Sequence, residues 1–277
     1  MQAQKSLFCC PVCGGALCRD RQALVCAAGH SFDAAAQGYV NLLPANHRHS
    51  QAPGDDKGMV AARRDFLDAG WYAPFAAALS ELACGCCAGI KAPVLLDAGC
   101  GEGYYTARLA AALGAGARVA AFDISKNAVR SAAGRYKGIE FAVASSFAMP
   151  LADATVDCAV NVFSPMVPAE FARVLRPGAA LIYAVPSARH LFGLKEILYE
   201  QPYENAVEDV AYPGFALSRR VPVRGSITLN DAGMIAALFA MTPYYWKTPR
   251  GGAERLAAQT SLTTEIGFDF LVYLREG

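Results

Sequence analysis

A glycine-rich turn after residue 97 carries the most specific chemical signal in the chain. An apolar segment ends at Asp97, and Gly99, Gly101 and Gly103 follow at alternate positions, before a segment with helical character. Glycines at this spacing let a ligand approach the backbone without a side-chain clash, and the start of a helix offers free N–H groups. The turn therefore predicts a binding site for a polar ligand.

The spacing and charge of this turn distinguish between two kinds of ligand. Dinucleotide-binding turns read G-x-G-x-x-G, whereas this one reads G-x-G-x-G and includes Glu102, which would repel a pyrophosphate. S-adenosylmethionine has no phosphate, and acids attract its ammonium and sulfonium. A second apolar segment ends at Asp123, about twenty residues after the turn, where a carboxylate can bind both ribose hydroxyls. We therefore predict an S-adenosylmethionine site that uses Asp97, Asp123 and the turn at Gly99 and Gly101.

Four residues near the N-terminus have the spacing of metal ligands. Cys10-x2-Cys13 and Cys26-x3-His30 form two short knuckles that together offer four donors to one ion. A module of about forty residues has too little core to fold alone, so we expect one structural zinc that fills all four positions. Cys9 competes with Cys10 as a ligand, although Cys10 gives the tighter spacing. The alternative for the whole set is a chance cluster of buried thiols.

Alternating strands and helices after residue 92 predict a parallel sheet with right-handed crossovers. We expect strands at 93–98, 118–123, 139–144, 156–162 and 179–185, and helices at 104–113, 126–136, 168–175 and 187–200. Segments 215–228 and 264–274 alternate apolar and polar residues, which indicates antiparallel edge strands. The predicted fold class is α/β, with a class I (Rossmann-like) methyltransferase core and a small N-terminal zinc-ribbon module.

Three parts of the chain follow from this pattern. We assign residues 1–45 to the zinc-binding module, 46–92 to a linker and helices that cover the cofactor site, and 93–277 to the S-adenosylmethionine-dependent methyltransferase domain. Helical spacing between residues 59 and 82 is interrupted by Gly70 and Pro74, which predicts two helices. Ligands in such folds bind at the carboxyl ends of the parallel strands. Ser145 and Asn161 fall there and join the candidate cofactor contacts.

The composition gives no overall attraction to nucleic acid or membrane. The net charge is +1 and the pI is about 7.5, so any RNA must be bound by a local patch. No run of eighteen apolar residues and no secretory signal is present, and we expect a cytoplasmic protein without a membrane partner. The ten cysteines are then expected as thiols or metal ligands. No exposed apolar stripe specifies an oligomer, and a homodimer stays open.

Five further segments complete an ordered set of motifs: Gly38–Pro44, Ala62–Gly70, Val143–Ser146, Pro186–Leu191 and Met241–Pro243. With the cysteine pattern and the glycine turn, this set resembles the bacterial 23S ribosomal RNA guanine-N1 methyltransferases that act on the helix 35 hairpin. The resemblance covers nearly the whole chain. It implies that the zinc module helps to recognise the 23S rRNA hairpin and that the class I core transfers a methyl group to guanine N1.

The resemblance also implies four more contacts to S-adenosylmethionine, at Tyr72, Tyr105, Thr106 and His190. Tyr105 and Thr106 lie at the first turn of the helix after the glycines, where backbone donors and a hydroxyl can meet the amino acid end. Tyr72 can close its ring face over the sulfonium. Core packing is the alternative for Tyr72, and capping or packing of a helix is the alternative for His190. Ser145 stands where many class I enzymes have the carboxylate that binds the adenine amino group.

The implied reaction is a displacement in which guanine N1 attacks the methyl carbon and loses its proton. Alignment of the two reactants and a base near that proton would accelerate it. Asp55 and Asp56 in the polar linker are candidates for the base. Asn161 is a further catalytic candidate, without the role of base, because its loop partly resembles the Asn-Pro-Pro-Tyr motif of amino-methylating enzymes, although the paired proline and the tyrosine are missing. The catalytic residue is otherwise unassigned.

Three arginines and one phenylalanine are further candidates to assist the reaction. Arg63, Arg64 and Arg189 are candidate donors for the negative charge that develops on guanine O6. Phe163 can stack on an extruded guanine, and burial under the sheet edge is the alternative for this ring.

Two other functions compete with RNA methylation. A non-catalytic RNA or ribosome binder with a retained methyltransferase fold is disfavoured by Asp97, the glycine turn and Asp123, which are all present. A small-molecule methyltransferase needs no zinc ribbon, so the N-terminal pattern favours a macromolecular acceptor, although zinc ribbons also bind proteins.

Overall fold

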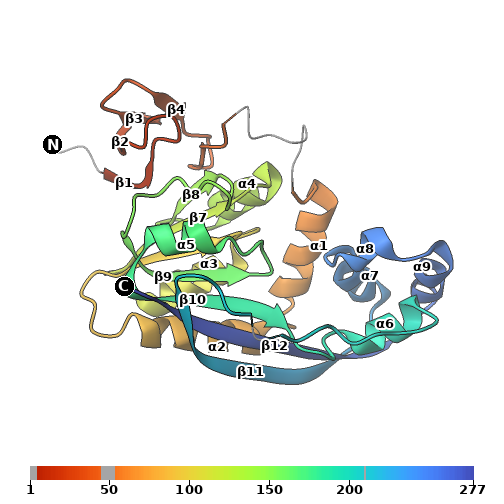
Figure 1. The fold of residues 1–277 in the computed structure, drawn as a ribbon. Coiled ribbons are helices and arrows are strands. Elements are labelled where there is room, and N and C mark those ends of the chain that lie inside the picture. Colours follow the sequence, from red (N-terminus) through yellow and green to blue (C-terminus); the bar gives the residue numbers. More distant parts are fainter. Residues whose placement is uncertain (1–4, 45–53, 209) are drawn as a thin grey trace.

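Two sheets organise the part of the chain that the computed structural model describes, which is residues 5–44, 54–208 and 210–277 (Figure 1). The N-terminal sheet is antiparallel and contains β1 (Lys5–Cys9), β2 (Ala16–Asp20), β3 (Ala23–Cys26) and β4 (Ser31–Asp33), in that order. The large sheet has eight strands in the order β11-β12-β10-β9-β6-β7-β8-β5.

The large sheet is parallel over most of its width. Its parallel strands are β5 (Val40–Asn41), β6 (Val94–Ala98), β7 (Arg118–Asp123), β8 (Glu140–Val143), β9 (Val156–Val162) and β10 (Leu175–Pro186). Two long strands, β11 (Phe215–Leu229) and β12 (Leu262–Arg275), add antiparallel pairs beside β10. All seven residues of β9 are buried, as expected for a central strand with both faces covered.

Helices cover both faces of this sheet and its carboxyl edge. They are α1 (Lys57–Asp68), α2 (Ala73–Cys86), α3 (Tyr104–Leu113), α4 (Lys126–Arg135), α5 (Pro168–Val174), α6 (Phe192–Leu198), α7 (Ala232–Ala240), α8 (Tyr244–Lys247) and α9 (Arg250–Ala257). Neighbouring residues of β6 point to opposite faces: Leu95 joins the core with Phe75 of α2, and Leu96 joins Phe171 of α5. Within the described residues, no helix is both long and apolar enough to cross a bilayer.

The α/β fold and most of the expected elements are confirmed. The five parallel strands, the helices α3 to α5 and the two helices around Gly70 lie close to their expected bounds. The helix expected at 187–200 is shorter, because Ser187 and His190 belong to a turn that leads to Leu191 in the left-handed region, and α6 begins after it. The three helices between residues 232 and 257 were not expected from the sequence.

The N-terminal ribbon is fastened to the large sheet at several points. Cys9 donates its backbone N–H to the Pro150 carbonyl at 2.7 Å, and Phe8, which is 1% exposed, bridges to Leu151. Farther along, β5 pairs with β8, although its residues fall in the part assigned to the zinc-binding module. The ribbon and the large domain therefore share backbone hydrogen bonds and core.

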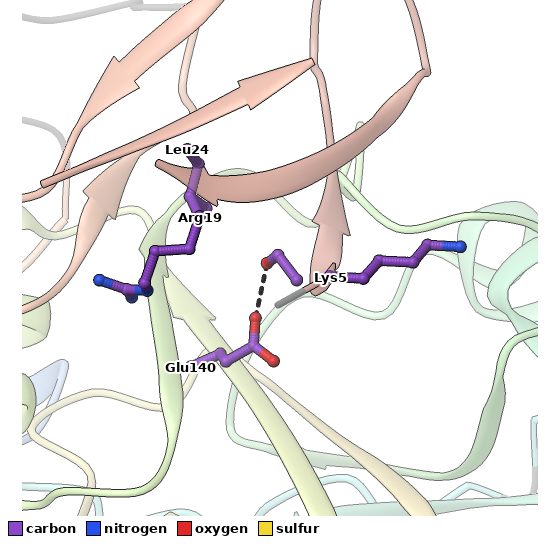
Figure 2. Close-up of a pocket in the computed structure, with 5 residues that line it drawn as sticks. Lys5, Arg19, Leu24 and Glu140 are labelled. Atoms are coloured by element: carbon purple, nitrogen blue, oxygen red, sulfur yellow. Dashed lines mark hydrogen bonds between the residues drawn. The ribbon is translucent and has the colours of Figure 1, made fainter. Parts of the chain in front are cut away.

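A partly buried carboxylate at the start of β8 completes this junction. Figure 2 shows the small pocket that is lined by Lys5, Arg19 and Leu24 of the ribbon and by Glu140 of β8, with the Lys5 side chain pointing away from Glu140. Glu140 accepts hydrogen bonds from the Ser6 hydroxyl at 2.5 Å and from the Leu7 backbone at 2.9 Å. One side chain at the start of β8 thus fixes the course of β1.

Candidate active site and zinc centre

Two knuckles of the ribbon bring the four expected metal ligands together. The donor atoms of Cys10, Cys13, Cys26 and His30 all lie within 4.8 Å of one another. The two glycine turns Gly14 and Gly29, with φ of +70° and +85°, close these knuckles through hydrogen bonds to the first cysteine of each pair.

The distances within this cluster fit a tetrahedral metal. The Sγ atoms of Cys13 and Cys26 are 3.7 Å apart, and His30 Nδ1 lies 3.5 Å from Cys10 Sγ and 3.3 Å from Cys26 Sγ. Ligands about 2.3 Å (sulfur) and about 2.0 Å (nitrogen) from zinc at tetrahedral angles are separated by roughly 3.5–3.8 Å. The cluster includes Cys10 and leaves out Cys9, so the geometry favours the ligand with the tighter sequence spacing.

We expect Cys26→Ser to lose the metal and to lower the melting temperature, because zinc that binds only the folded state stabilises it by mass action. Cys18→Ser is the matched control, since this thiol on β2 lies outside the cluster. Zinc content by mass spectrometry should fall from about one ion per chain to near zero in the first variant and stay unchanged in the second. A Cys26→Ser protein that keeps its zinc would contradict this ligand assignment.

At the large sheet, a buried and a partly buried carboxylate accept hydrogen bonds from the glycine turn and from the residues that follow the two strands. Asp97 is the penultimate residue of β6, is 1% exposed, and accepts a 2.5 Å hydrogen bond from the Thr106 hydroxyl. Asp123 ends β7 and accepts from the Gly101 backbone at 3.0 Å and from the Ser125 backbone at 2.7 Å. The turn therefore lies between the ends of two neighbouring strands, as the parallel pairing of β6 and β7 requires.

A third carboxylate lies inside the turn. Glu102 is 2% exposed, and its Oε2 has no hydrogen-bond partner. The nearest cation is Arg63 of α1, whose Nη1 is 3.9 Å from that oxygen and also forms an ion pair with Asp55. Arg63 Nη2 donates to the Met241 carbonyl at 3.4 Å, so α1 connects the turn to the end of α7.

Burial makes these acids hard to ionise. Burial raises the pKa of Asp97 to about 7, with Asp123 and Glu102 adding to the rise and the Thr106 hydroxyl opposing it. Burial likewise raises the pKa of Glu102 to about 7 against the attraction of Arg63. Burial also raises the pKa of Asp123, although the Ser125 and Gly101 backbones oppose it. A cation in this place would relieve the repulsion, and S-adenosylmethionine carries two positive groups, so the residues present fit this donor.

Aromatic rings line the other side of the turn. Tyr72 is buried between Phe66 and Phe268, with ring centroids 5.2 Å and 5.0 Å away, and the His190 ring is 6.2 Å from it. His190 accepts a hydrogen bond from the Gly267 backbone at its Nδ1 (3.3 Å), and burial lowers its pKa to about 3. The imidazole is therefore neutral near pH 7. Both residues lie in one aromatic cluster, as core packing also requires.

The loop after β9 is shaped by Asn161. Its Oδ1 accepts from the Ser164 backbone at 3.1 Å and its Nδ2 donates to the Pro165 carbonyl at 3.1 Å. Ser164 in turn donates to the Ala98 carbonyl at 3.0 Å, and a Cβ added at Gly99 would lie 2.3 Å from the Ser164 Cβ. The close approach of this loop to the turn explains why only glycine fits at position 99.

Phe163 occupies an unusual position in the same loop. Its φ of +56° is uncommon for an aromatic residue, and its side chain is 49% exposed, so burial under the sheet edge is ruled out for much of the ring. The ring lies nearly parallel to that of Phe75 (6.1 Å, 17°) and that of His190 (6.4 Å, 22°). A flat face is thus presented beside the turn.

The structure places most of the expected cofactor contacts around this one edge. Those near the turn are Asp97, Gly99, Gly101, Tyr105, Thr106, Asp123 and Asn161, and those in the aromatic cluster are Tyr72 and His190. Ser145 follows β8, two strands from β6, and its hydroxyl accepts from the Phe147 backbone at 3.2 Å. Sequence reasoning did not find Ser164 or Phe268, because only the folded loop and β12 bring them to the turn.

Comparison with known proteins decides the family. Residues 8–51 match the model described as "RlmA, N-terminal", a zinc ribbon, and residues 95–178 match a methyltransferase domain. The 23S rRNA (guanine(748)-N(1))-methyltransferase of Streptomyces fradiae is 35% identical, over 90% of this chain and 89% of that protein. The chain belongs to the 23S rRNA (guanine-N1)-methyltransferase family.

Two more relatives named for the same activity support this membership. A Micromonospora griseorubida protein is 38% identical over 92% of this chain and 91% of its own length. The Bacillus subtilis (strain 168) protein YxjB is 31% identical, over 98% of each chain. This family member is thus an S-adenosylmethionine-dependent methyltransferase with a class I core and an N-terminal zinc ribbon.

We expect this methyltransferase to bind S-adenosylmethionine more tightly as the pH rises from about 6 to about 8. Asp97 and Glu102, each with a pKa of about 7, are largely protonated at the lower pH, and a bound cation favours their ionised forms. Each group can contribute up to about tenfold in Kd over this range. Titration calorimetry at the two pH values measures it.

The control ligand for this titration is S-adenosylhomocysteine, whose sulfur is neutral, and its affinity should change less with pH. Glu102→Gln should flatten the dependence for S-adenosylmethionine while leaving the contribution of Asp97. Equal affinities for the cationic donor at both pH values would show that these acids do not respond to it.

Proposed function

We propose that this protein transfers the methyl group of S-adenosylmethionine to N1 of a guanine in 23S ribosomal RNA, in the helix 35 hairpin. The observation that carries the proposal is full-length similarity to proteins named for this activity, with a zinc ribbon and a methyltransferase core in one chain. The relative from Streptomyces fradiae is named for guanine 748. A hairpin loop suits such an enzyme, because unstacked loop bases expose their Watson–Crick edges.

The proposed cofactor contacts are those expected from the sequence, and different residues bind different parts of S-adenosylmethionine. The carboxylate of Asp123 binds the ribose hydroxyls, and the turn at Gly99 and Gly101 lets the donor lie against the backbone. When bound, S-adenosylmethionine supplies an electrophilic methyl group on a positive sulfur. Tyr72 and the neutral His190 border the sulfonium side, where the ring of Tyr72 favours positive charge. The remaining contacts are Asp97, Tyr105, Thr106, Ser145 and Asn161.

The proposed zinc ligands are Cys10, Cys13, Cys26 and His30. With four protein donors, the ion has no open position for water or substrate, so its role is structural. The ribbon packs into the same apolar core as Leu151 and Phe171 of the large domain. We therefore propose that zinc fixes the shape of a rigid surface that presents the RNA to the methyltransferase core.

Asp55 is the stronger of the two candidates for the base. Asp56 caps α1, because its Oδ1 accepts from the Met59 backbone at 2.9 Å. Asn161 uses both polar atoms of its side chain to hold the loop after β9. Asp55 is 28% exposed in its side chain and forms an ion pair with Arg63, so its carboxyl group lies beside the glycine turn and is accessible from solvent.

Phe163 is the proposed stacking partner for the target guanine. Half of its surface is free, and its ring plane is fixed by Phe75 and His190. An extruded base needs a flat partner that keeps N1 in line with the methyl group, and most of the acceleration should come from this alignment. Of the arginines, Arg63 lies at the turn, whereas Arg189 pairs with Glu204 and Glu265 at the protein surface.

The proposed partner is ribosomal RNA, and the proposed location is the cytoplasm, where ribosomal RNA is made in bacteria. A homodimer stays a proposal of the sequence alone, and light scattering on the purified protein measures it directly.

The test of the proposed function is nucleoside mapping by mass spectrometry, after incubation of helix 35 fragments of 23S RNA with the protein and methyl-labelled donor. We expect 1-methylguanosine at one loop guanine and none in a fragment in which that guanine is replaced by adenine. Donor binding without RNA methylation would overturn the proposal and favour a small-molecule or protein acceptor, with the ribbon as a docking element.

Asp55→Asn should lower kcat by about 10²-fold or more, because it removes the proposed base, while KM for the donor stays near that of the wild type. Asp56→Asn is the matched control: asparagine also caps helices well, so this variant should keep its rate and its stability. Single-turnover kinetics on the hairpin measure both. Equal rates for the wild type and both variants would remove Asp55 as the base.

A further inference from the structure

An aromatic surface lies outside the site described above, on the short helix α8. Tyr245 is 46% exposed and Trp246 is 66% exposed, which is unusual for neighbouring large rings. Successive residues of a helix are rotated by about 100° around its axis. Tyr244 is therefore half-buried, while the side chains of Tyr245 and Trp246 are exposed to solvent. We call Tyr245 and Trp246 the α8 platform.

The α8 platform packs against α7 through Tyr245. The Tyr245 ring packs against Phe239 of α7 at 5.4 Å, and the Trp246 ring meets Tyr245 edge-on at 5.0 Å and 90°. Tyr244 lies 5.5 Å from the ammonium of Lys195, a buried side chain of α6. These contacts restrict the side-chain conformations of the two rings before a ligand binds, so less conformational entropy is lost when a ligand stacks on them.

The position of α8 relates the platform to the methyl-transfer site. Met241, three residues before α8, accepts the hydrogen bond from Arg63, and Arg63 lies at the glycine turn beside Glu102. In Figure 1, α7 and α8 stand beside α1 at the side where the parallel strands end. The platform thus borders the region from which an RNA loop would approach.

Charge next to the rings favours a nucleic acid over an apolar protein segment. Lys247 is exposed and directly follows Trp246. Arg250 is 93% exposed and is paired with Glu254 at 2.8 Å. Exposed rings beside cations are the usual arrangement for unpaired bases and their phosphates, because every base has a stacking face.

We propose that Tyr245 and Trp246 stack on unpaired loop nucleotides that flank the target guanine, with Lys247 at a neighbouring phosphate. This proposal rests on the proposed function and extends it: Phe163 takes the guanine, and the α8 platform holds its neighbours. Because the target guanine and its neighbours are bound at different places, the enzyme can recognise a loop rather than a single base.

The first experiment uses the intrinsic fluorescence of Trp246. The chain has two tryptophans, and the indole N–H of the other, Trp71, has no hydrogen-bond partner, so Trp71→Phe removes it without leaving an orphaned acceptor. In this background we expect the helix 35 hairpin to quench the remaining fluorescence, and a fully paired duplex of the same stem to quench it much less. Binding of the hairpin without quenching would overturn the proposal.

The second experiment compares Trp246→Ala with Trp246→Phe. We expect the alanine variant to raise KM for the hairpin by about tenfold or more, and the phenylalanine variant to stay within about threefold of the wild type, because a ring still stacks. The Kd for S-adenosylmethionine should be unchanged in both. Lys247→Ala should reduce the salt dependence of hairpin binding by about one ion.

The outcomes separate the two proposals. A wild-type protein that methylates the hairpin, with Trp246→Ala equally active, would sink the platform and leave the proposed function intact. A wild type that neither binds nor methylates the hairpin would sink both. A Trp246→Ala protein that keeps full RNA affinity but loses binding of a ribosomal protein would assign the surface to a protein partner instead.

Discussion

Buried negative charge at the glycine turn is the constraint on which the rest of the site depends. Asp97 and Glu102 lie in the interior, and Asp123 is partly buried, because the turn lies between the ends of two neighbouring strands. Carboxylates in such a place need partners, and the chain supplies them from three elements: a hydroxyl of α3, two backbone N–H groups and one guanidinium. The guanidinium of Arg63 brings α1 over the turn, and α1 in turn positions α7.

The zinc knuckles, the glycine turn and the parallel strands could be predicted from the sequence, because each depends on residues that are close together in the chain. The two knuckles depend on spacings of three and four residues, and the turn depends on glycines at alternate positions. The strand pattern was also clear, because buried parallel strands such as β9 are mostly apolar: Asp157 and Asn161 are its polar residues, and the other five are apolar. Asp56 could have been read as a helix cap rather than a base, since it stands three residues before Met59 at the start of a helical segment.

What the sequence could not predict depends on long-range packing. The left-handed conformation of Phe163 follows from bonds that Asn161 and Ser164 make around the loop, and none of these has a spacing signal. The placing of Tyr72 beside His190 is created by Phe268, which lies far away in the chain. Helix α7 was missed because its apolar residues lie all around the helix, so the segment lacks the one-sided periodicity of a surface helix.

The two edge strands of the large sheet, β5 and β11, have features that disfavour pairing with a second chain. Unpaired strand edges are templates for aggregation. At one end, the two-residue strand β5 pairs with β8, while β1 of the ribbon donates hydrogen bonds to Glu140 and Pro150 nearby. At the other end, β11 is fifteen residues long but carries Pro222 and the arginines at 219, 220 and 224, which disfavour edge-to-edge pairing. The segment that follows the zinc ribbon therefore also covers the β8 edge of the large sheet, and detachment of β5 would leave that edge unpaired.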